Sequence, residues 1–327
     1  MARFPNLLDV TQAMNPDGSI AAVAELLAQI NEVMPDWTFT EGNLPTGHQS
    51  VARTGLPTST WRKLYGGVQP DKSKRAKITD SCGMLEAYNE VDKAVADLNG
   101  NTEAFRTSEA AAQLESMSQD LAETLFYGNV SVNPERFEGL AARYSTLSAS
   151  NADNIIDGAG VGSDNASIWL INWAPGKCYG IYPKGSTAGI TMTDKGQVTI
   201  ENADGAGGRM EAYRTHFRVD AGLVLQDWRN VVRICNIDRS LLKADISTGA
   251  DLPDLMSDAI ERIPVIGPNC AFYMDRSLRQ IWRKQMATKM KNSTLSVEDV
   301  GGVRSPMFEE IPIRRVDRLA VDEARVV

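Results

Sequence analysis

The sequence predicts an α+β fold in which helices and strands occupy separate blocks of the chain. Three observations support this prediction: a long amphipathic helical pattern at residues 103–127, a series of short β-like runs over residues 168–237, and a return of helical periodicity after residue 250. With 327 residues, the chain is long enough to form two or three domains.

Residues 15–35 are predicted to form a short amphipathic helix. Asp17 or Ser19 can cap its start, and Pro35 is expected to end it. Its apolar residues fall on one face at helical spacing, namely Ile20, Val23, Leu27, Ile30 and Met34. Because one face is apolar, this helix is expected to dock on another part of the protein.

Residues 40–82 are rich in Gly, Thr, Ser and Pro and show no helical period. Residues 50–54 and 61–65 are predicted to be short strands placed around turns. A stretch of this length with so little core-forming pattern is unusual inside a compact domain. The segment is therefore expected to be either disordered or a projecting arm that is buried against a neighbouring subunit.

Residues 103–127 give the clearest helical pattern in the chain. Thr102 can cap this helix and Gly128 is expected to end it. An apolar stripe runs along it through Leu114, Met117, Leu121 and Leu125. At 1.5 Å per residue the helix is about 37 Å long, which predicts a spine against which other elements pack.

The second half of the chain is β-like first and helical later. Short runs rich in β-branched and aromatic residues predict strands at 169–171, 179–182, 197–200, 217–219, 223–225 and 231–237. Two amphipathic helices follow, one with Pro253 in its first turn and one capped by Asp275. Cys270–Met274 and residues 311–316 are predicted to be strands.

Composition excludes several functional classes. The net charge of −8 and the pI near 5.0 disfavour tight nucleic-acid binding, which needs clustered basic residues. The four cysteines lie far apart without C-x-x-C spacing, which predicts reduced thiols in a cytosolic protein. Residues 1–8 do not resemble a signal peptide, and no apolar run approaches the roughly 18–20 residues of a membrane span, so a soluble protein made in a cytoplasm is expected.

One glycine-rich segment resembles a dinucleotide-binding turn. Gly158, Gly160 and Gly162 follow the strand-like residues 154–157, as phosphate-binding glycines do. The required helix is missing, because residues 163–165 lead into another strand-like run. The segment is therefore predicted to be a surface turn that needs positive φ, without a cofactor.

The sequence contains no recognisable catalytic or metal-binding motif. His48 and His216 are the two histidines, and neither has Cys, Asp or Glu at ligand spacing. Residues 153–157 lack the glutamate that a calcium loop places at its twelfth position. We find no serine-hydrolase, Walker or zinc-protease motif, so we expect no catalytic residue, no metal and no cofactor.

Two polar clusters remain as candidate contact sites. Asp227, Trp228, Arg229 and Arg233 could hold a carboxylate or phosphate, but an ion-pair network at a strand edge or a subunit interface is favoured. The basic run Lys72, Lys74, Arg75 and Lys77 indicates a solvated face or an electrostatic contact with an acidic neighbouring subunit.

Stretches along nearly the whole chain match a known family, and their order is the informative feature. They are residues 15–18, 53–57, 61–62, 126–129, 139–144, 154–158, 167–170, 180–185, 227–229, 233–238 and 311–317. In these stretches the chain resembles the major capsid proteins of short-tailed bacteriophages (podovirus type). Those proteins are part of the tailed-phage family that has the Hong Kong 97-like capsid fold.

The resemblance implies a division of the chain into five segments. Residues 1–39 form an N-terminal arm with a short helix, 40–82 an extended β-hairpin loop, and 83–165 a peripheral domain with its spine helix at 103–127. Residues 166–237 form a β-rich segment shared between the peripheral and axial domains, and 238–327 form the axial domain with a closing strand. The resemblance leaves the strand order open.

The resemblance also implies a structural function without enzymatic activity. Copies of the chain would form hexamers and pentamers of an icosahedral head around double-stranded DNA, assembled in the bacterial cytoplasm and located in the virion. Scaffolding, portal and cement or decoration proteins would be partners, contact with the DNA would be weak and non-specific, and no membrane would be involved. The candidate subunit-interface residues are Trp61, Arg62, Leu64, Tyr65, Lys72, Lys74, Arg75, Asp227, Trp228, Arg229 and Arg233.

Two other functions make different predictions. A nucleotide-dependent oxidoreductase that uses the glycines at 158–162 requires a helix after Gly162. A β-rich phage protein that binds a host or a glycan through Trp169, Trp173 and Tyr179 would form a small oligomer instead of a shell, and the long spine helix fits it poorly.

Overall fold

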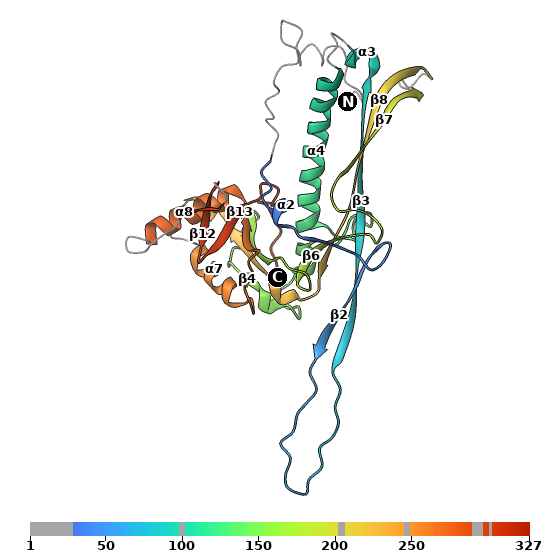
Figure 1. The fold of residues 1–327 in the computed structure, drawn as a ribbon. Helices are drawn as coiled ribbons and strands as arrows, with labels where there is room; N and C mark the ends of the chain where they lie inside the picture. The colour runs from blue at the N-terminus through green and yellow to red at the C-terminus, as the bar shows by residue number, and fades with distance from the viewer. Residues whose placement is uncertain (1–28, 98–101, 202–206, 245–248, 290–296, 301–302) are drawn as a thin grey trace.

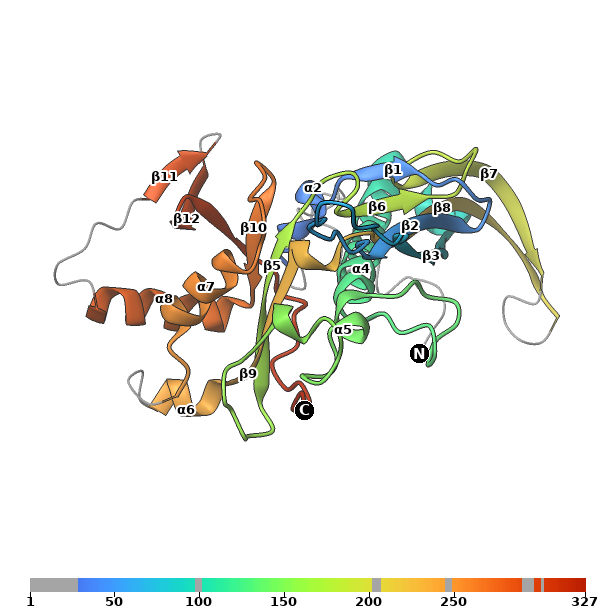
Figure 2. The same ribbon diagram turned by 90° about the horizontal axis from the view of Figure 1, so that it is seen from below.

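The computed structural model describes residues 29–97, 102–201, 207–244, 249–289, 297–300 and 303–327. A six-stranded sheet lies alongside the long helix α4 (Thr102–Tyr127), and a seven-stranded sheet with its own helices forms the other half of the molecule (Figures 1 and 2). A hairpin formed by strands β2 (Gly47–Gly55) and β3 (Lys74–Asp92) projects far beyond this body (Figure 1). The predicted α+β class is confirmed.

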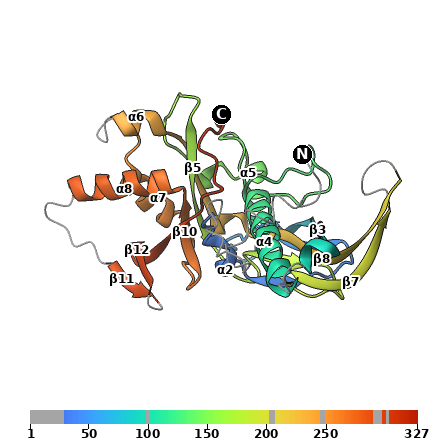
Figure 3. The same cartoon turned by 90° about the horizontal axis from the view of Figure 1, so that it is seen from above.

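The six-stranded sheet has the order β1-β6-β8-β3-β2, with β7 paired to β8. Its other strands are β1 (Phe39–Glu41), β6 (Cys178–Tyr182), β7 (Thr191–Glu201) and β8 (Arg209–Leu225). Strands β3 and β8 pair antiparallel over eleven residues, from Cys82 with Gly222 to Asp92 with Ala212. Figure 3 shows α4 lying against this sheet beside β3 and β8. Since side chains alternate between the two faces of a strand, Leu85 and Val91 pack toward α4, whereas Met84 and Tyr88 are exposed on the opposite face.

Helix α4 confirms the predicted spine. Met117, Leu121 and Leu125 are buried, and Leu114 packs against them. The helix ends at Gly128, whose N–H donates to the Thr124 carbonyl at 2.8 Å. A Cβ at position 128 would lie 2.3 Å from the Phe137 carbonyl oxygen, so the tight chain crossing after α4 requires glycine.

The seven-stranded sheet has the order β11-β12-β13-β10-β5-β9-β4. Its strands are β4 (Ile155–Asp157), β5 (Asn165–Asn172), β9 (Val231–Asp238), β10 (Cys270–Met274), β11 (Val297–Val300), β12 (Val303–Phe308) and β13 (Ile311–Arg315). Helices α7 (Leu252–Glu261) and α8 (Arg276–Lys289) cover it and bury Met256 and Trp282. The predicted cap of α8 is confirmed, because the Asp275 carboxylate accepts from the Ser277 N–H at 2.7 Å.

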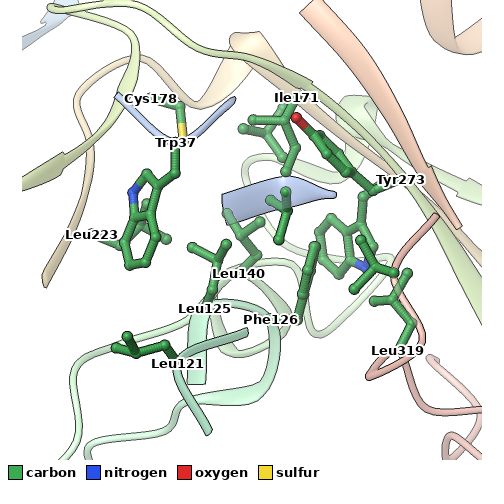
Figure 4. Packing of buried hydrophobic residues seen from close by; sticks show 14 of the residues in the cluster. Trp37, Leu121, Leu125, Phe126, Leu140, Ile171, Cys178, Leu223, Tyr273 and Leu319 are labelled. Carbon is green, nitrogen blue, oxygen red and sulfur yellow. The ribbon is translucent and has the colours of Figure 1, made fainter. Parts of the chain in front are cut away.

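Short elements complete the described fold. They are the helices α2 (Val33–Asp36), α3 (Lys93–Ala96), α5 (Leu140–Arg143) and α6 (Arg239–Ala244) and the 3-10 turns η2 (Ala152–Asn154) and η3 (Trp228–Asn230). Among the apolar clusters of the described residues, one contains side chains from both sheets and from α4 and so joins the two halves of the molecule (Figure 4). In it Phe126 of α4 packs on Trp169 of β5 and on Tyr273 of β10, with ring centroids 6.1 and 6.4 Å apart.

The C-terminal residues 317–327 cross back from the seven-stranded sheet toward the end of α4. The Glu323 N–H donates to the Asn165 carbonyl, and the Val327 carbonyl accepts from the Leu147 N–H at 3.1 Å. The last segment, 238–327, which was expected to belong to the axial domain, therefore ends in contact with both halves of the molecule.

Of the helix predicted over residues 15–35, residues 15–28 lie outside the described residues, and of residues 29–35 only 33–35 are helical, as part of α2. Asn31 forms a β-bridge with Val316 instead of continuing a helix. Pro35 does not end a helix but lies inside the single turn α2. A proline is tolerated there because the first turn of a helix has no i−4 hydrogen bond to lose.

Two predictions about strands also need correction. Residues 61–65 are not a strand, and the runs at 217–219 and 223–225 are parts of one continuous strand, β8. The expected boundary between residues 82 and 83 falls inside β3, and β4 belongs to the seven-stranded sheet although it precedes residue 165. Cross-strand pairing with β8 keeps β3 extended through polar residues whose pattern alone predicts no strand.

Candidate assembly surface

Residues 56–73, here named the hairpin tip, connect β2 to β3 at the far end of the projecting hairpin (Figure 1). Trp61 is 99% exposed, Leu64 90%, Tyr65 fully exposed and Leu56 80%. Large apolar side chains gathered on one projection mark an interaction site, because a soluble monomer rarely exposes such a patch. Leu56 is a contact candidate that the sequence did not single out.

The hairpin tip has a defined local structure despite its exposure. The Asp71 carboxylate accepts from the Thr58 N–H at 2.8 Å and from the Lys72 N–H at 2.7 Å, so it joins the two sides of the tip. These hydrogen bonds, with that of the Thr58 hydroxyl first, lower the pKa of the Asp71 carboxyl. A turn follows Lys63, whose carbonyl accepts from the Gly66 N–H at 3.0 Å.

The hairpin is strongly basic, in contrast to the acidic chain as a whole. From Arg53 to Lys77 it has seven basic side chains and one acidic side chain, Asp71. Arg53 and Arg75 stand directly opposite each other on β2 and β3. Like charges in that position are destabilising unless a partner neutralises them. The hairpin is therefore suited to contact an acidic surface.

The root of the hairpin is fixed to the body by a buried ion pair. The Arg143 guanidinium lies 2.8 Å from Asp80 of β3 and also donates to the Leu223 carbonyl at 3.1 Å. Burial raises the pKa of the Asp80 carboxyl, although the positive charge of Arg143 acts in the opposite direction. From this root β3 continues unbroken to Lys74, where the hairpin tip begins.

Asp227, Trp228 and Arg229 form a second exposed cluster. Arg229 binds the Asp227 carboxylate through two hydrogen bonds of 2.9 Å, and Trp228 is partly exposed. A neighbouring loop exposes Val265 and Ile266, and the Asn172 side chain holds this loop through the Val265 carbonyl at 2.8 Å. The sequence analysis missed these two residues, although an apolar pair between Pro264 and Gly267 is a detectable signal.

Arg233 is a wrong interface candidate, because it lies inside the subunit. Its guanidinium pairs with Glu323 at 2.8 Å, donates to the Tyr144 carbonyl at 2.7 Å and stacks 5.1 Å from the Trp169 ring centroid. The side chains of both partners are about 95% buried. A buried guanidinium needs such a partner within its own subunit, so it is not available to a neighbour.

The glycine-rich segment 158–162 is a tight turn between β4 and β5, and the helix that a dinucleotide site requires does not follow it. The positive φ that was expected at a glycine occurs at Ala159 instead, at 60°. Gly160 is needed for a different reason: a Cβ there would lie 2.4 Å from the Asn236 carbonyl oxygen. The oxidoreductase interpretation therefore lacks its structural requirement.

Replacing Gly160 with alanine is expected to lower the free energy of unfolding by about 1–3 kcal/mol, as overpacking of a buried backbone contact does. Chemical denaturation of the unassembled subunit measures the change. Gly67→Ala is the control, since a Cβ at position 67 meets nothing within 4 Å. An unchanged stability of the Gly160 variant would contradict the close-contact explanation.

The aromatic residues that a glycan-binding protein would use are not on the surface. Trp169, Trp173 and Tyr179 are all buried, and Trp173 donates to the Tyr273 hydroxyl at 2.8 Å. The surface that this alternative needs is therefore missing.

The described residues contain no group of three or more metal-ligating side chains. All four cysteines are unpaired. Burial raises the pKa of the Cys178 and Cys270 thiols to about 12 and of the Cys82 and Cys235 thiols to about 11. At neutral pH these groups are thiols, which react far more slowly than thiolates.

Two hollows flank the sheet near the hairpin root. One of about 460 Å³ is lined by residues of β3 and β8 and by the loop after β6, which includes Lys184. Two of its charged lining residues, Arg218 and Asp220, pair with each other at 3.0 Å. The other, of about 240 Å³, lies between β3, β8 and the C-terminal half of α4, and we name it the α4 groove.

The decisive comparison is with a family of phage proteins. The sequence profile of the family described as major capsid protein GP7 matches residues 15–327. The chain belongs to this family. The solved cryo-EM structure of bacteriophage Epsilon15 contains a chain 33% identical to it, with a TM-score of 0.78, covering 99% of this chain and 97% of that one. No curated protein sequence matches.

Other solved structures are more remote. A chain of Microbacterium phage Oxtober96 has a TM-score of 0.44 at 10% identity and covers 70% of this chain and 98% of that one. An encapsulin from Synechococcus elongatus has a TM-score of 0.42 at 9% identity, covering 71% and 95%. Similarities this weak carry no argument about the present chain.

The capsid family and the Epsilon15 match establish a structural role. The chain is a major capsid protein of podovirus type with the Hong Kong 97-like fold, it self-associates into capsomers, and its place is the capsid of the virion. In the described ranges no helix is long and apolar enough to cross a bilayer.

Proposed function

We propose that this capsid protein forms hexamers and pentamers that close into an icosahedral head around double-stranded DNA, after assembly in the host cytoplasm. The observation that supports the proposal most is the fully exposed, apolar and basic hairpin tip. An ordered residue costs roughly 1–2 kcal/mol of backbone entropy, which exposed side chains do not offset. The tip therefore gains its stabilising contacts from an adjacent subunit.

The geometry of a projecting hairpin favours closed rings of subunits. A contact between the tip of one copy and the body of the next is heterologous, and such contacts form rings when the rotation between copies closes. Within a shell every subunit is held by several neighbours at once, so contacts that are weak individually give a stable assembly. The proposed interface residues are the tip residues Trp61, Arg62, Leu64, Tyr65 and Lys72, the basic β3 residues Lys74 and Arg75, and the cluster Asp227, Trp228 and Arg229.

The proposed partners beyond the chain itself follow from the role of a shell protein. Scaffolding, portal and cement proteins are expected to bind the assembling or finished shell. Contact with the packaged DNA is expected to be weak and non-specific, since the net charge of −8 opposes tight binding to phosphates. A weak contact also permits the DNA to leave the head.

Replacing both exposed aromatic residues of the tip, Trp61→Ser with Tyr65→Ser, is expected to abolish shell formation while the subunit stays folded. Both side chains lie in solvent in the single subunit, so their loss changes the free energy of unfolding by no more than about 0.5 kcal/mol. Negative-stain electron microscopy and size-exclusion chromatography of the expressed protein, produced with its genomic neighbours, measure assembly. Denaturation measures folding.

The matched control replaces two other exposed apolar residues, Val161→Ser with Met192→Ser, which are 76% and 62% exposed and lie away from the tip. These substitutions are expected to leave shells intact. Normal particles from the tip variant would overturn the assignment of the tip as an assembly element.

A further inference from the structure

We propose that the hairpin tip of one subunit inserts an aromatic side chain into the α4 groove of a second copy of this chain. The inference rests on the proposed function and adds to it a receptor site with named residues. The apolar surface of the α4 groove comes mainly from Leu85, Leu121, Phe137 and Val219. Its charged lining residues are Asp120, Glu135 and Arg136, and the Arg136 guanidinium already pairs with Glu123 at 3.3 Å.

The tip cannot fill the groove of its own subunit. Lys74 marks the start of β3 at the tip, and Gly83 of the same strand lines the groove. Nine residues of extended strand separate them by about 30 Å at 3.3 Å per residue. Figure 1 shows the tip projecting from the body in the direction away from α4. An occupant with the chemistry of the tip therefore comes from another copy.

The size of the groove matches one aromatic side chain. A cavity of roughly 150 Å³ accommodates a benzene molecule, and the α4 groove measures about 240 Å³. Trp61 and Tyr65 are the two aromatic residues of the tip, and both are fully exposed. Aromatic side chains seated in apolar pockets commonly supply most of the binding energy of a protein interface.

The charges of the two surfaces are complementary. Helix α4 has five carboxylate side chains and one arginine, and within the described residues Asp120 and Glu135 have no ion-pair partner. Arg62 and Lys63 directly follow Trp61 in the tip. When an aromatic residue of the tip enters the groove, these two cations come close to the carboxylates of Asp120 and Glu135. The attraction favours the orientation of the tip in which Arg62 and Lys63 face these carboxylates.

The larger hollow on the opposite face of the sheet fits the tip less well. Its charged lining residues are Lys184, Arg218 and Asp220, and the Asp220 carboxylate already accepts two hydrogen bonds of 3.0 Å from Arg218. It therefore offers no free carboxylate pair for Arg62 and Lys63.

The contact between a tip and an α4 groove is heterologous, because it joins two different surfaces of the chain. In a ring, each copy therefore inserts its tip into one neighbour and receives the tip of the other neighbour.

The first test uses a photo-crosslinker in assembled shells. Trp61 is replaced with p-benzoylphenylalanine, shells are purified and irradiated, and the cross-linked peptides are identified by mass spectrometry. The expected cross-links join position 61 to residues 119–124 or 135–137 of another copy. If shells form but the cross-links fall elsewhere, the groove is wrong while the proposed function stands. If the unmodified chain forms no shells, the proposed function itself fails.

The second test reverses the charges. An acidic-tip variant (Arg62→Glu with Lys63→Glu) and a basic-groove variant (Asp120→Lys with Glu135→Lys) are each expected to reduce shell yield at least tenfold. Combining all four substitutions in one chain is expected to restore shells. Circular dichroism and denaturation confirm that every variant is folded. Failure of the fourfold variant to recover assembly would overturn the pairing of tip and groove.

The charge-reversed variants also give a test specific to a heterologous contact. In the acidic-tip chain both the tip and the groove are acidic, and in the basic-groove chain both are basic. Two neighbouring copies of the same variant therefore repel each other, whereas neighbouring copies of different variants attract. Every contact in a ring is complementary only when the two variants alternate. Alternation is possible in a ring of six and impossible in a ring of five. An equimolar mixture is therefore expected to give hexameric rings without closed shells. Closed shells from the mixture would contradict the inference.

Discussion

Replacing Glu323 with alanine is expected to lower the free energy of unfolding by about 3–5 kcal/mol, because it leaves the Arg233 guanidinium buried without a counter-charge. Glu323 also accepts from the Tyr127 hydroxyl at 2.5 Å and is bound by Ser167. Burial raises the pKa of Tyr127 well above its usual value, so this hydroxyl stays a neutral donor. Urea denaturation of the unassembled subunit, followed by tryptophan fluorescence, measures the loss.

The neighbouring exposed residue gives a matched control: Asp322→Ala removes a carboxylate from the same tail and is expected to change the stability by no more than about 0.5 kcal/mol. Replacing both members of the pair, Arg233→Met with Glu323→Leu, is expected to recover most of the stability, since a well-packed apolar pair substitutes for a buried ion pair. A Glu323→Ala variant as stable as the parent would show that the tail does not hold the two halves together.

Replacing Phe126 with alanine is expected to destabilise the subunit by about 3–5 kcal/mol, the usual cost of removing a buried phenylalanine. Phe126 is completely buried at the end of α4, and its ring packs on Trp169 and Tyr273 of the seven-stranded sheet. The loss therefore falls on the core that joins both halves, and hydrogen exchange should increase in both sheets together. Chemical denaturation gives the magnitude.

Phe105 provides the comparison, because it is a buried phenylalanine near the other end of the same helix. It packs in a small cluster with Val91 and Ala96. Phe105→Ala is expected to cost less than Phe126→Ala and to increase hydrogen exchange mainly near the start of α4. Equal losses at both positions, or local exchange in the Phe126 variant, would contradict the view that one core unites the molecule.

The sequence predicted the elements whose pattern repeats over many residues. Helix α4 follows from its apolar stripe, and α7, α8 and β10 follow from caps and short apolar runs. The sequence also predicted Trp61, Leu64 and Tyr65 as candidate contact residues, because large apolar side chains in a segment without a core pattern have no place to be buried locally. Their near-complete exposure agrees with that reasoning.

The long strand β3 and the residues around Arg233 show where sequence reasoning failed. Polar residues fill much of β3, which pairs with β2 up to Ser81 and with β8 from Cys82 onward. This successive pairing makes it a continuous strand through the predicted boundary at residue 82. Arg233 belongs to the same sequence cluster as Arg229, but it lies in the interior, because its partner Glu323 is 90 residues away in the chain. Local sequence does not contain such a partner.

By itself, the sequence determined the fold class, the spine helix and the segment that cannot bury its own aromatic residues, because periodicity and composition act over neighbouring positions. The tertiary structure alone decided which arginine is interior and where an acidic, apolar groove opens beside α4. The interior position of Arg233 and the α4 groove both depend on residues that are far apart in the chain and that folding brings within a few ångströms. A local sequence pattern cannot predict such contacts.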